Sequence, residues 1–344
     1  MTDRGEPATQ TAAERQRAWR KFALRVFVSI ALLAILLWIL PWHEVRDAFA
    51  RVPALAFVGA IGIYMTLHLI GAAKWRMVVN TAGAGISMLH AVRFYWAGLF
   101  GNTFLPSIVG GDVVRAGLAL RYARSRTGLV LGSVVDRMVD VLGLAAVAGL
   151  GVLVLPSALD ARSRGIFIGL FVVLAALGLI GLGAAYLFLR RKLSFHLRRR
   201  VVSLRRAART MANRPGVVVA AFLMGVVLQT SLVVLTAWLG RLCGIEVPIQ
   251  VWLFVWPLAK ISALTPITQG GLGVREAAQA ALFAPFGVPA SLAVAVSLVF
   301  QGVIISGGLI GGLLSFLLGR RSRNGNAADL ATAPVRDGLA YRQQ

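Results

Sequence analysis

Six apolar runs, each about 20 residues long, restrict the class of fold that this chain can adopt. At a rise of about 1.5 Å per residue, such a run crosses the hydrocarbon core of a bilayer as an α-helix. Since 58% of the 344 residues are hydrophobic, a single water-soluble core cannot bury them all. We therefore predict an all-α polytopic membrane protein, with full spans at 22–40, 54–73, 128–155, 166–189, 216–240 and 290–318.

The basic residues gather in one set of loops. The net charge of +23 comes mainly from Lys and Arg that precede the first span, precede the 128–155 span, fill 190–214 and follow the last span. This distribution follows the topology and does not form a groove-binding face, so we expect no nucleic-acid partner. By the positive-inside rule these loops are cytoplasmic, which places both termini on the cytoplasmic side of a bacterial inner membrane.

A motif of one proline, paired glycines and one arginine occurs twice. The second copy keeps the internal spacing of the first and follows it by 160 residues: Pro106-x-x-x-Gly110-Gly111-x-x-x-Arg115 and Pro266-x-x-x-Gly270-Gly271-x-x-x-Arg275. Each copy breaks an apolar run with helix-disrupting residues and then places an arginine at membrane depth. Since a charge there is costly, the motifs are the first place to look for function.

The apolar runs that lead into the motifs, 88–104 and 250–264, are too short to cross a bilayer comfortably. The loop charges return the first motif to the cytoplasmic side and the second to the opposite side. We therefore predict about six full transmembrane helices plus two oppositely oriented re-entrant helical hairpins. Such an inverted repeat, with one copy over about 54–155 and the other over about 214–318, is typical of secondary transporters.

One integral membrane domain is expected at 22–318, between a basic cytoplasmic tail at 1–21 and a disordered cytoplasmic tail at 319–344. Between the repeats, apolar residues within 190–214 follow a three-or-four spacing among ten Lys and Arg residues. This pattern predicts an amphipathic helix at the cytoplasmic surface. Attraction to anionic lipid head groups and an ordinary basic loop both account for its charge.

Each motif has the chemistry of an oxyanion site, because backbone amides at a helix start lie beside a forked guanidinium. The alternative is that Asp112 pairs with Arg115, and Glu276 with a cation, only to hold the hairpins together. The residues that we predict to bind a lipid head group are Asn102, Pro106, Gly110, Gly111, Asp112, Arg115, Pro266, Gly270, Gly271, Gly273, Arg275 and Glu276.

A second charged group lies within the 128–155 span and has no counterpart in the second repeat. Three functions are open for this group: a salt bridge that locks one access state, a proton-coupling carboxylate, or a partner for a substrate amine or coupling ion. The alternative is a buried ion pair with the hairpin arginines. A lone lysine in the second short run either assists anion binding or pairs with a nearby carboxylate. The residues assigned to coupling or gating are Asp136, Arg137, Asp140 and Lys260.

Other chemistry has little support in the sequence. The four histidines are scattered without ligand spacing and the single cysteine has no partner, so we expect no metal site and no cofactor. No nucleophile, base and orienting group recur at a helpful spacing, so no catalytic residue is assigned and a transporter is favoured over an enzyme.

Three ordered motifs resemble those of the lysylphosphatidylglycerol synthase transmembrane, or flippase-like, family. They are Gly101-Asn102-Thr103-Phe104-Leu105-Pro106 through Gly110-Gly111-Asp112 to Arg115, then Asp136-Arg137 with Asp140, and Pro266 through Gly270-Gly271-Leu272-Gly273-Val274-Arg275-Glu276. The resemblance implies a domain like the lipid-translocating part of the multiple peptide resistance factors. Those proteins carry a soluble aminoacyl-transferase domain after the membrane part, whereas about 25 residues follow the last span here, so aminoacyl-lipid synthesis is not expected.

The resulting prediction is an inner-membrane lipid translocator whose two hairpins meet near the midplane and hold a lipid phosphate. The expected ligands are anionic or polyprenyl-linked membrane lipids. A homo-oligomer or lipid-biosynthesis enzymes are the further candidate partners. The alternatives are a membrane-embedded transferase acting on lipid-linked substrates, and a non-catalytic subunit of a lipid, glycolipid or hopanoid biosynthetic complex.

Overall fold

The computed structural model describes residues 40–104, 110–154, 213–263 and 271–331, together with 209–211 and isolated positions at 27–38 and 202. The predicted span at 22–40 is therefore described only at single positions. Several other predictions lie wholly or largely outside the described residues: the span at 166–189, the basic segment at 190–214, Pro106, Pro266 and Gly270.

Within the described residues, four helices are long and apolar enough to cross a membrane: α3 (Ala54–Thr81), α6 (Arg126–Val154), α9 (Pro215–Leu242) and α12 (Ala290–Ala331), the last as far as Arg320. Their positions agree with the spans predicted at 54–73, 128–155, 216–240 and 290–318. The described part of the chain is entirely helical apart from its turns and loops. The protein is thus an all-helical membrane protein.

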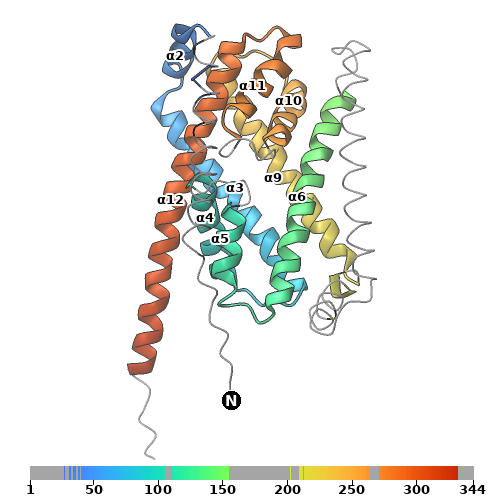
Figure 1. The fold of residues 1–344 in the computed structure, drawn as a ribbon, viewed down its shortest axis with the longest axis vertical. Helices are drawn as coiled ribbons and strands as arrows, with labels where there is room; N and C mark the ends of the chain where they lie inside the picture. The colour runs from blue at the N-terminus through green and yellow to red at the C-terminus, as the bar shows by residue number, and fades with distance from the viewer. Residues whose placement is uncertain are drawn as a thin grey trace, which may run out of the picture.

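Two pairs of shorter helices follow the first and the third of these spans. In the first pair α4 (Met88–Phe104) precedes α5 (Gly110–Ala119), and in the second α10 (Ile249–Ser262) precedes α11 (Val274–Phe283). We call them the first and the second hairpin. The two hairpins lie in opposite halves of the molecule, with α10 and α11 at the top of Figure 1 and α4 and α5 in its lower half.

Both hairpins run antiparallel. In the first, the Asn102 side chain near the end of α4 accepts a hydrogen bond from the Gly111 amide at the start of α5, at 2.9 Å. In the second, Trp252 near the start of α10 packs edge-on against Phe283 at the end of α11, with ring centroids 4.8 Å apart. A side-chain acceptor at a helix start satisfies an amide that has no partner within the helix, which lets α5 begin there.

Glycines allow the long helix α12 to pack closely along the first hairpin. A Cβ at Gly308 would meet Thr103 and Leu99, and one at Gly312 would meet Phe100. Close backbone approach through small residues is a common way for helices to associate inside membranes. The interface between α4 and α12 is therefore tightly closed.

The two ends of the molecule differ in charge. At the lower end of Figure 1, where the Arg124 amide bonds the Ala84 carbonyl at 2.9 Å, the described charged side chains are all basic. They are Arg76, Arg93, Arg121, Arg124, Arg126, Arg209, Arg214 and Arg320. The upper end, which also holds α2 (Trp42–Ala50) and the short 3₁₀ helix η2 (Ala284–Phe286), balances Arg46, Arg51 and Arg241 against Glu44, Asp47 and Glu246.

Two helix ends differ from the sequence-based expectation. Helix α3 continues to Thr81, whereas the apolar run was taken to end at 73, just before Lys74. That lysine is fully buried inside the protein and does not mark a loop. Helix α12 continues as a helix to Ala331, beyond the expected start of the tail at 319.

Candidate functional site

A polar cavity of about 280 Å³ lies between the two hairpins, and all four spans contribute to its wall near their middle. Its volume is at the lower edge of the range of about 300–1,000 Å³ typical of small-ligand pockets. The polar and aromatic residues in the wall are Tyr64, His68, Tyr95, Asn102, Thr103, Asp112, Arg115, Arg137, Asp140, Gln229, Trp256, Lys260, Arg275, Phe300 and Gln301.

Behind the wall, Lys74 of α3 joins two carboxylates of α6. Its Nζ lies 2.5 Å from Asp136 Oδ1 and 2.8 Å from Asp140 Oδ1. Lys74 and Asp136 are fully buried, while Asp140 keeps 18% of its side chain exposed and lines the cavity. Since an unpaired charge is very costly at this depth, each of the three side chains depends on the others.

Arg115, the arginine of the first motif, is committed to partners within the protein. Its Nη2 lies 2.9 Å from Asp112 Oδ1 and 3.3 Å from Asp136 Oδ2. Its guanidinium also lies over the rings of Trp75 and Tyr95, at 4.9 Å and 5.1 Å from their centroids. These contacts attach the first hairpin to α3 and α6, and they match the alternative in which Asp112 and Arg115 pair to hold the hairpin.

Arg137 of α6 completes the cluster from the outside. It forms an ion pair with Asp112 Oδ2, so that Asp112 connects Arg137 and Arg115. The Arg137 side chain is 41% exposed, compared with 6% for Arg115. Asp136 and Arg137 of the predicted group are therefore bound to the first hairpin by ion pairs, whereas Asp140 pairs with Lys74 of α3.

The arginine of the second motif has a more local set of partners. Arg275 Nη2 lies 2.6 Å from Glu276 Oε1, and its Nε donates to Ser297 Oγ of α12 at 3.2 Å. Glu276 also accepts from the Gly273 amide at 2.6 Å, which closes the turn before α11. Gly271 and Gly273 adopt φ angles of +79° and +83°, a backbone region that glycine enters without strain.

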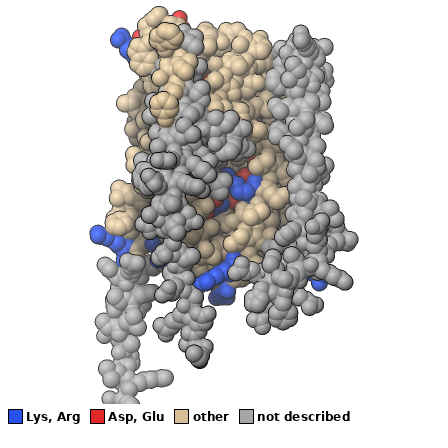
Figure 2. All heavy atoms as spheres, in the orientation of Figure 1, with Lys and Arg blue, Asp and Glu red and all other residues tan. Residues whose placement is uncertain are grey.

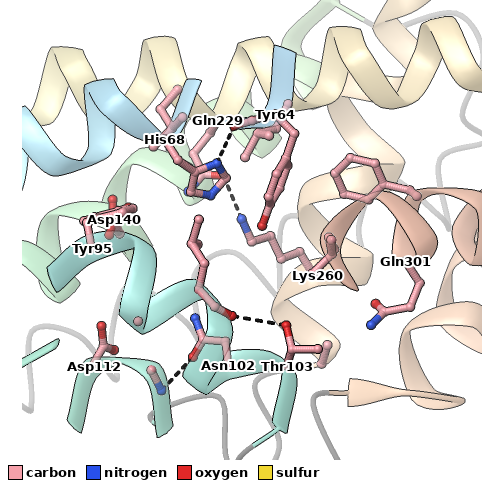
Figure 3. A pocket seen from close by; sticks show the side chains of 18 of the residues that line it. Tyr64, His68, Tyr95, Asn102, Thr103, Asp112, Asp140, Gln229, Lys260 and Gln301 are labelled. Atoms are coloured by element: carbon pink, nitrogen blue, oxygen red, sulfur yellow. Dashed lines mark hydrogen bonds between the residues drawn. The ribbon is translucent and has the colours of Figure 1, made fainter. Parts of the chain in front are cut away.

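Lys260 of α10 differs from the other cations of the cavity. It donates to Gln229 Oε1 of α9 at 2.9 Å and lies over the Trp256 ring at 4.7 Å from its centroid. Its partner is a neutral amide, and no ion pair among the described residues includes it. Figure 3 shows Lys260 reaching toward Gln229 and His68, with Asp140 and Asp112 on the other side of the cavity.

The charges around the cavity leave a positive excess. Among the described residues, four basic side chains line it (Arg115, Arg137, Lys260 and Arg275) against two acidic ones (Asp112 and Asp140). Adding the buried neighbours Lys74, Asp136 and Glu276 gives five basic and four acidic groups, a formal sum of +1. Since carboxylates of the protein accompany the other cations, the excess is centred on Lys260, and the site suits an anion.

The structure brings together most of the residues that we predicted for the site. The predicted residues that line this cavity are Asn102, Gly111, Asp112, Arg115, Arg137, Asp140, Lys260 and Arg275. Those that lie in the helices and turns around it are Gly110, Gly271, Gly273, Asp136 and Glu276. Their roles in binding and coupling stay predictions. Among the described residues, no group of three or more His, Cys, Asp or Glu side chains is placed to hold a metal ion.

Sequence reasoning missed Lys74 and the polar side chains of α3 and α9. Lys74 lies just after the span predicted at 54–73 and was therefore not considered as a site residue. Its partners lie 62 and 66 residues further along the chain, so no local pattern could reveal them. Its signal was its place among apolar residues on both sides, since an ionisable residue inside a span points to function. His68 and Gln229, each within an apolar span, carried the same signal.

Residues 22–312 match the protein family described as the lysylphosphatidylglycerol synthase TM region. The match covers well over half of the chain and includes both hairpins and the charged group of α6. Comparison with curated proteins and with solved structures gives no match.

Proposed function

On the premise that the chain belongs to the lysylphosphatidylglycerol synthase transmembrane family, we propose that it moves lipids between the leaflets of a bacterial inner membrane. The transported lipid has an anionic, phosphate-bearing head group. The observation that carries this proposal is the charged cavity at the middle of four membrane spans, with Lys260 facing it and pairing with no carboxylate among the described residues.

The two hairpins enter the bilayer from opposite faces in this proposal. At about 1.5 Å per residue, their helices measure roughly 25 Å or less, and each is shorter than the hydrocarbon core of about 30 Å. The uniformly basic lower end is the cytoplasmic end by the positive-inside rule, and both termini lie on that side. The first hairpin then re-enters from the cytoplasm and the second from the opposite face, as expected for an inverted repeat.

The cavity holds the head group while the acyl or isoprenoid tails stay in the bilayer. Lys260 attracts the phosphate, and Arg275 lies in the same wall with 14% of its side chain exposed. The neutral donors Asn102, Gln229 and Gln301 surround the space that remains. Binding energy comes from replacing water around the phosphate by donors that the fold already holds in place.

Crossing requires the cavity to open alternately to the two sides. During this change the carboxylates of α6 neutralise the cation of the first hairpin, because Asp136 pairs with Arg115. Asp136 and Asp140 also share Lys74. The second hairpin carries its own counter-charge in the Arg275–Glu276 pair. Each hairpin therefore moves without leaving a bare charge in a region of low dielectric constant.

Reconstitution into liposomes tests this function. The purified protein is incorporated with head-group-labelled phosphatidylglycerol, a neutral glycolipid or an isoprenoid phosphate, and leaflet exchange is followed by quenching of the outer label. We expect exchange of the phosphate-bearing lipids well above that in protein-free vesicles. Exchange at the protein-free rate for all three contradicts the proposal. A change in lipid mass instead supports a transferase, and neither change supports a non-catalytic subunit.

A further inference from the structure

We propose that Arg137 is the docking point where the phosphate of an incoming lipid first binds, and that Asp112 is the carboxylate it displaces. This inference rests on the proposed function and adds the point of entry to the cavity. It assigns the Asp112–Arg137 pair a role as an exchangeable partner of the lipid head group. Lys260 then receives the phosphate deeper in the cavity.

Exposure separates Arg137 from the other ion-paired cations around the cavity. Its side chain is 41% exposed, whereas those of Arg275, Arg115 and Lys74 are 14%, 6% and 1% exposed. Arg137 lines the cavity and is also the cation that an outside phosphate meets with the least desolvation. Water and ligand reach Arg275, Arg115 and Lys74 less easily, so these three cations keep their partners within the protein.

Asp112 is able to give up Arg137 without becoming an unpaired charge. Its two carboxylate oxygens serve different cations, with Oδ2 on Arg137 and Oδ1 at 2.9 Å from Arg115. When a phosphate takes Arg137, Asp112 keeps Arg115, and Arg115 keeps both Asp112 and Asp136. The exchange therefore replaces one ion pair by another and leaves no buried charge unmatched.

The geometry at Arg137 favours such an exchange. Its Nε and Nη2 both contact the single oxygen Oδ2 of Asp112, because Oδ1 is engaged by Arg115. The carboxylate thus cannot form the two parallel bonds that an arginine fork makes with two oxygens. A phosphate offers several oxygens and satisfies the fork in that two-bond mode, which compensates for the loss of Asp112.

The position of the pair agrees with an entry point between α5 and α6. On the face drawn in Figure 2, basic and acidic atoms are visible in a hollow at mid-height, and the described surface that borders it is uncharged. Asp112 and Arg137 form one of the two ion pairs that join α5 to α6, and Val113 and Val134 beside them are 64% and 53% exposed. By contrast, the glycines of α12 close the opposite side of the first hairpin against α4.

Lipid retention measured by native mass spectrometry tests the docking point directly. Wild type, Arg137→Gln, Asp112→Asn and the control Arg126→Gln are purified in detergent and titrated with phosphatidylglycerol and with a neutral diacylglycerol glycolipid. Arg126 is exposed at the start of the same helix, so its variant removes an equal charge outside the cavity. Thermal unfolding of each variant establishes that the fold is retained.

We expect Arg137→Gln to retain phosphatidylglycerol about tenfold more weakly, since one charge-assisted contact is lost. Asp112→Asn should retain it several-fold more strongly, because the competing carboxylate is gone while Arg137 remains. Arg126→Gln and the binding of the neutral glycolipid should stay unchanged. Equal retention by wild type and Arg137→Gln overturns the inference, as does an equal loss in Arg126→Gln. If Asp112→Asn unfolds, Asp112→Ser replaces it, and weaker retention in that variant also overturns the inference.

The same proteins, reconstituted for leaflet exchange, distinguish the failure of this inference from that of the proposed function. Exchange by wild type with unchanged retention in Arg137→Gln removes the docking point and leaves the translocator. Loss of retention in Arg137→Gln without exchange by wild type keeps the docking point and removes the translocator.

Discussion

At the scale of single residues, two lysines inside the membrane differ in their partners. Lys74 shares two carboxylates and is fully buried, so it belongs to the framework of the cluster. Lys260 donates to a neutral amide and faces the cavity. The two lysines thus have different tasks, because Lys74 has its counter-charges inside the protein and Lys260 has none among the described residues.

Lys74→Met is expected to destabilise the protein by about 3–5 kcal/mol, because it leaves Asp136 and Asp140 with too little positive charge. The free energy of unfolding in mixed micelles measures this effect. The double variant Lys74→Met with Asp140→Asn removes one charge of each sign, and we expect it to recover at least half of the loss. A single variant as stable as wild type contradicts the structural role of Lys74.

At the scale of elements, the first hairpin depends on close contact between α4 and α5. A Cβ at Gly111 would meet the Gly98 carbonyl and the Asn102 side chain that caps α5. Gly117 of the same helix has nothing within 4 Å of such a Cβ. Substitution by alanine at these two positions therefore distinguishes the effect of close packing on stability from the effect of helix propensity within one helix.

Gly111→Ala should destabilise the protein by about 1–3 kcal/mol, because the added methyl forces the two helices apart. Gly117→Ala should be neutral or stabilise by up to about 1 kcal/mol, since alanine is the better helix former and the space is open. Thermal unfolding in detergent compares the two. Equal effects of both substitutions contradict the close packing of the hairpin.

The sequence predicted the positions of the helices better than it predicted which side chains pair between them. Local apolar runs predicted α4 as 88–104 and α10 as 250–264, close to the observed Met88–Phe104 and Ile249–Ser262. An ion pair between the charged group of the 128–155 span and the hairpin arginines was one of the alternatives that the sequence left open, and the structure has it between Asp136 and Arg115. The sequence could not choose this alternative, because the pair joins residues 21 positions apart on two helices whose packing no local pattern encodes. The same limit applies to Lys260, for which the sequence left a carboxylate partner open where the structure has Gln229.

At the scale of the whole molecule, the distribution of charge defines an axis. One end is uniformly basic among the described residues and the other is balanced, while the charged cavity lies between them. In the proposed topology, the two hairpins are inverted along this axis, and each side of the membrane has its own route to the cavity. The proposed orientation rests on the loop charges and the positive-inside rule.

Cysteine labelling tests the orientation. In a Cys243→Ala background, Arg121→Cys at the lower end should react only with reagent on the cytoplasmic side, and Glu246→Cys at the upper end only with reagent outside. The native Cys243 is a weak background in any case, because its side chain is buried and desolvation raises the pKa of its thiol to about 11. Labelling of both positions from the same side contradicts the topology.

The central claim is that Lys260 supplies the free positive charge that carries a lipid phosphate through the membrane. The most direct test is the rate of phosphatidylglycerol exchange in liposomes that contain wild type, Lys260→Gln or Lys260→Arg. We expect Lys260→Gln to lose about tenfold or more of the rate, and Lys260→Arg to keep most of it, since only the charge is essential. A Lys260→Gln protein that folds and exchanges the lipid at the wild-type rate would contradict the claim.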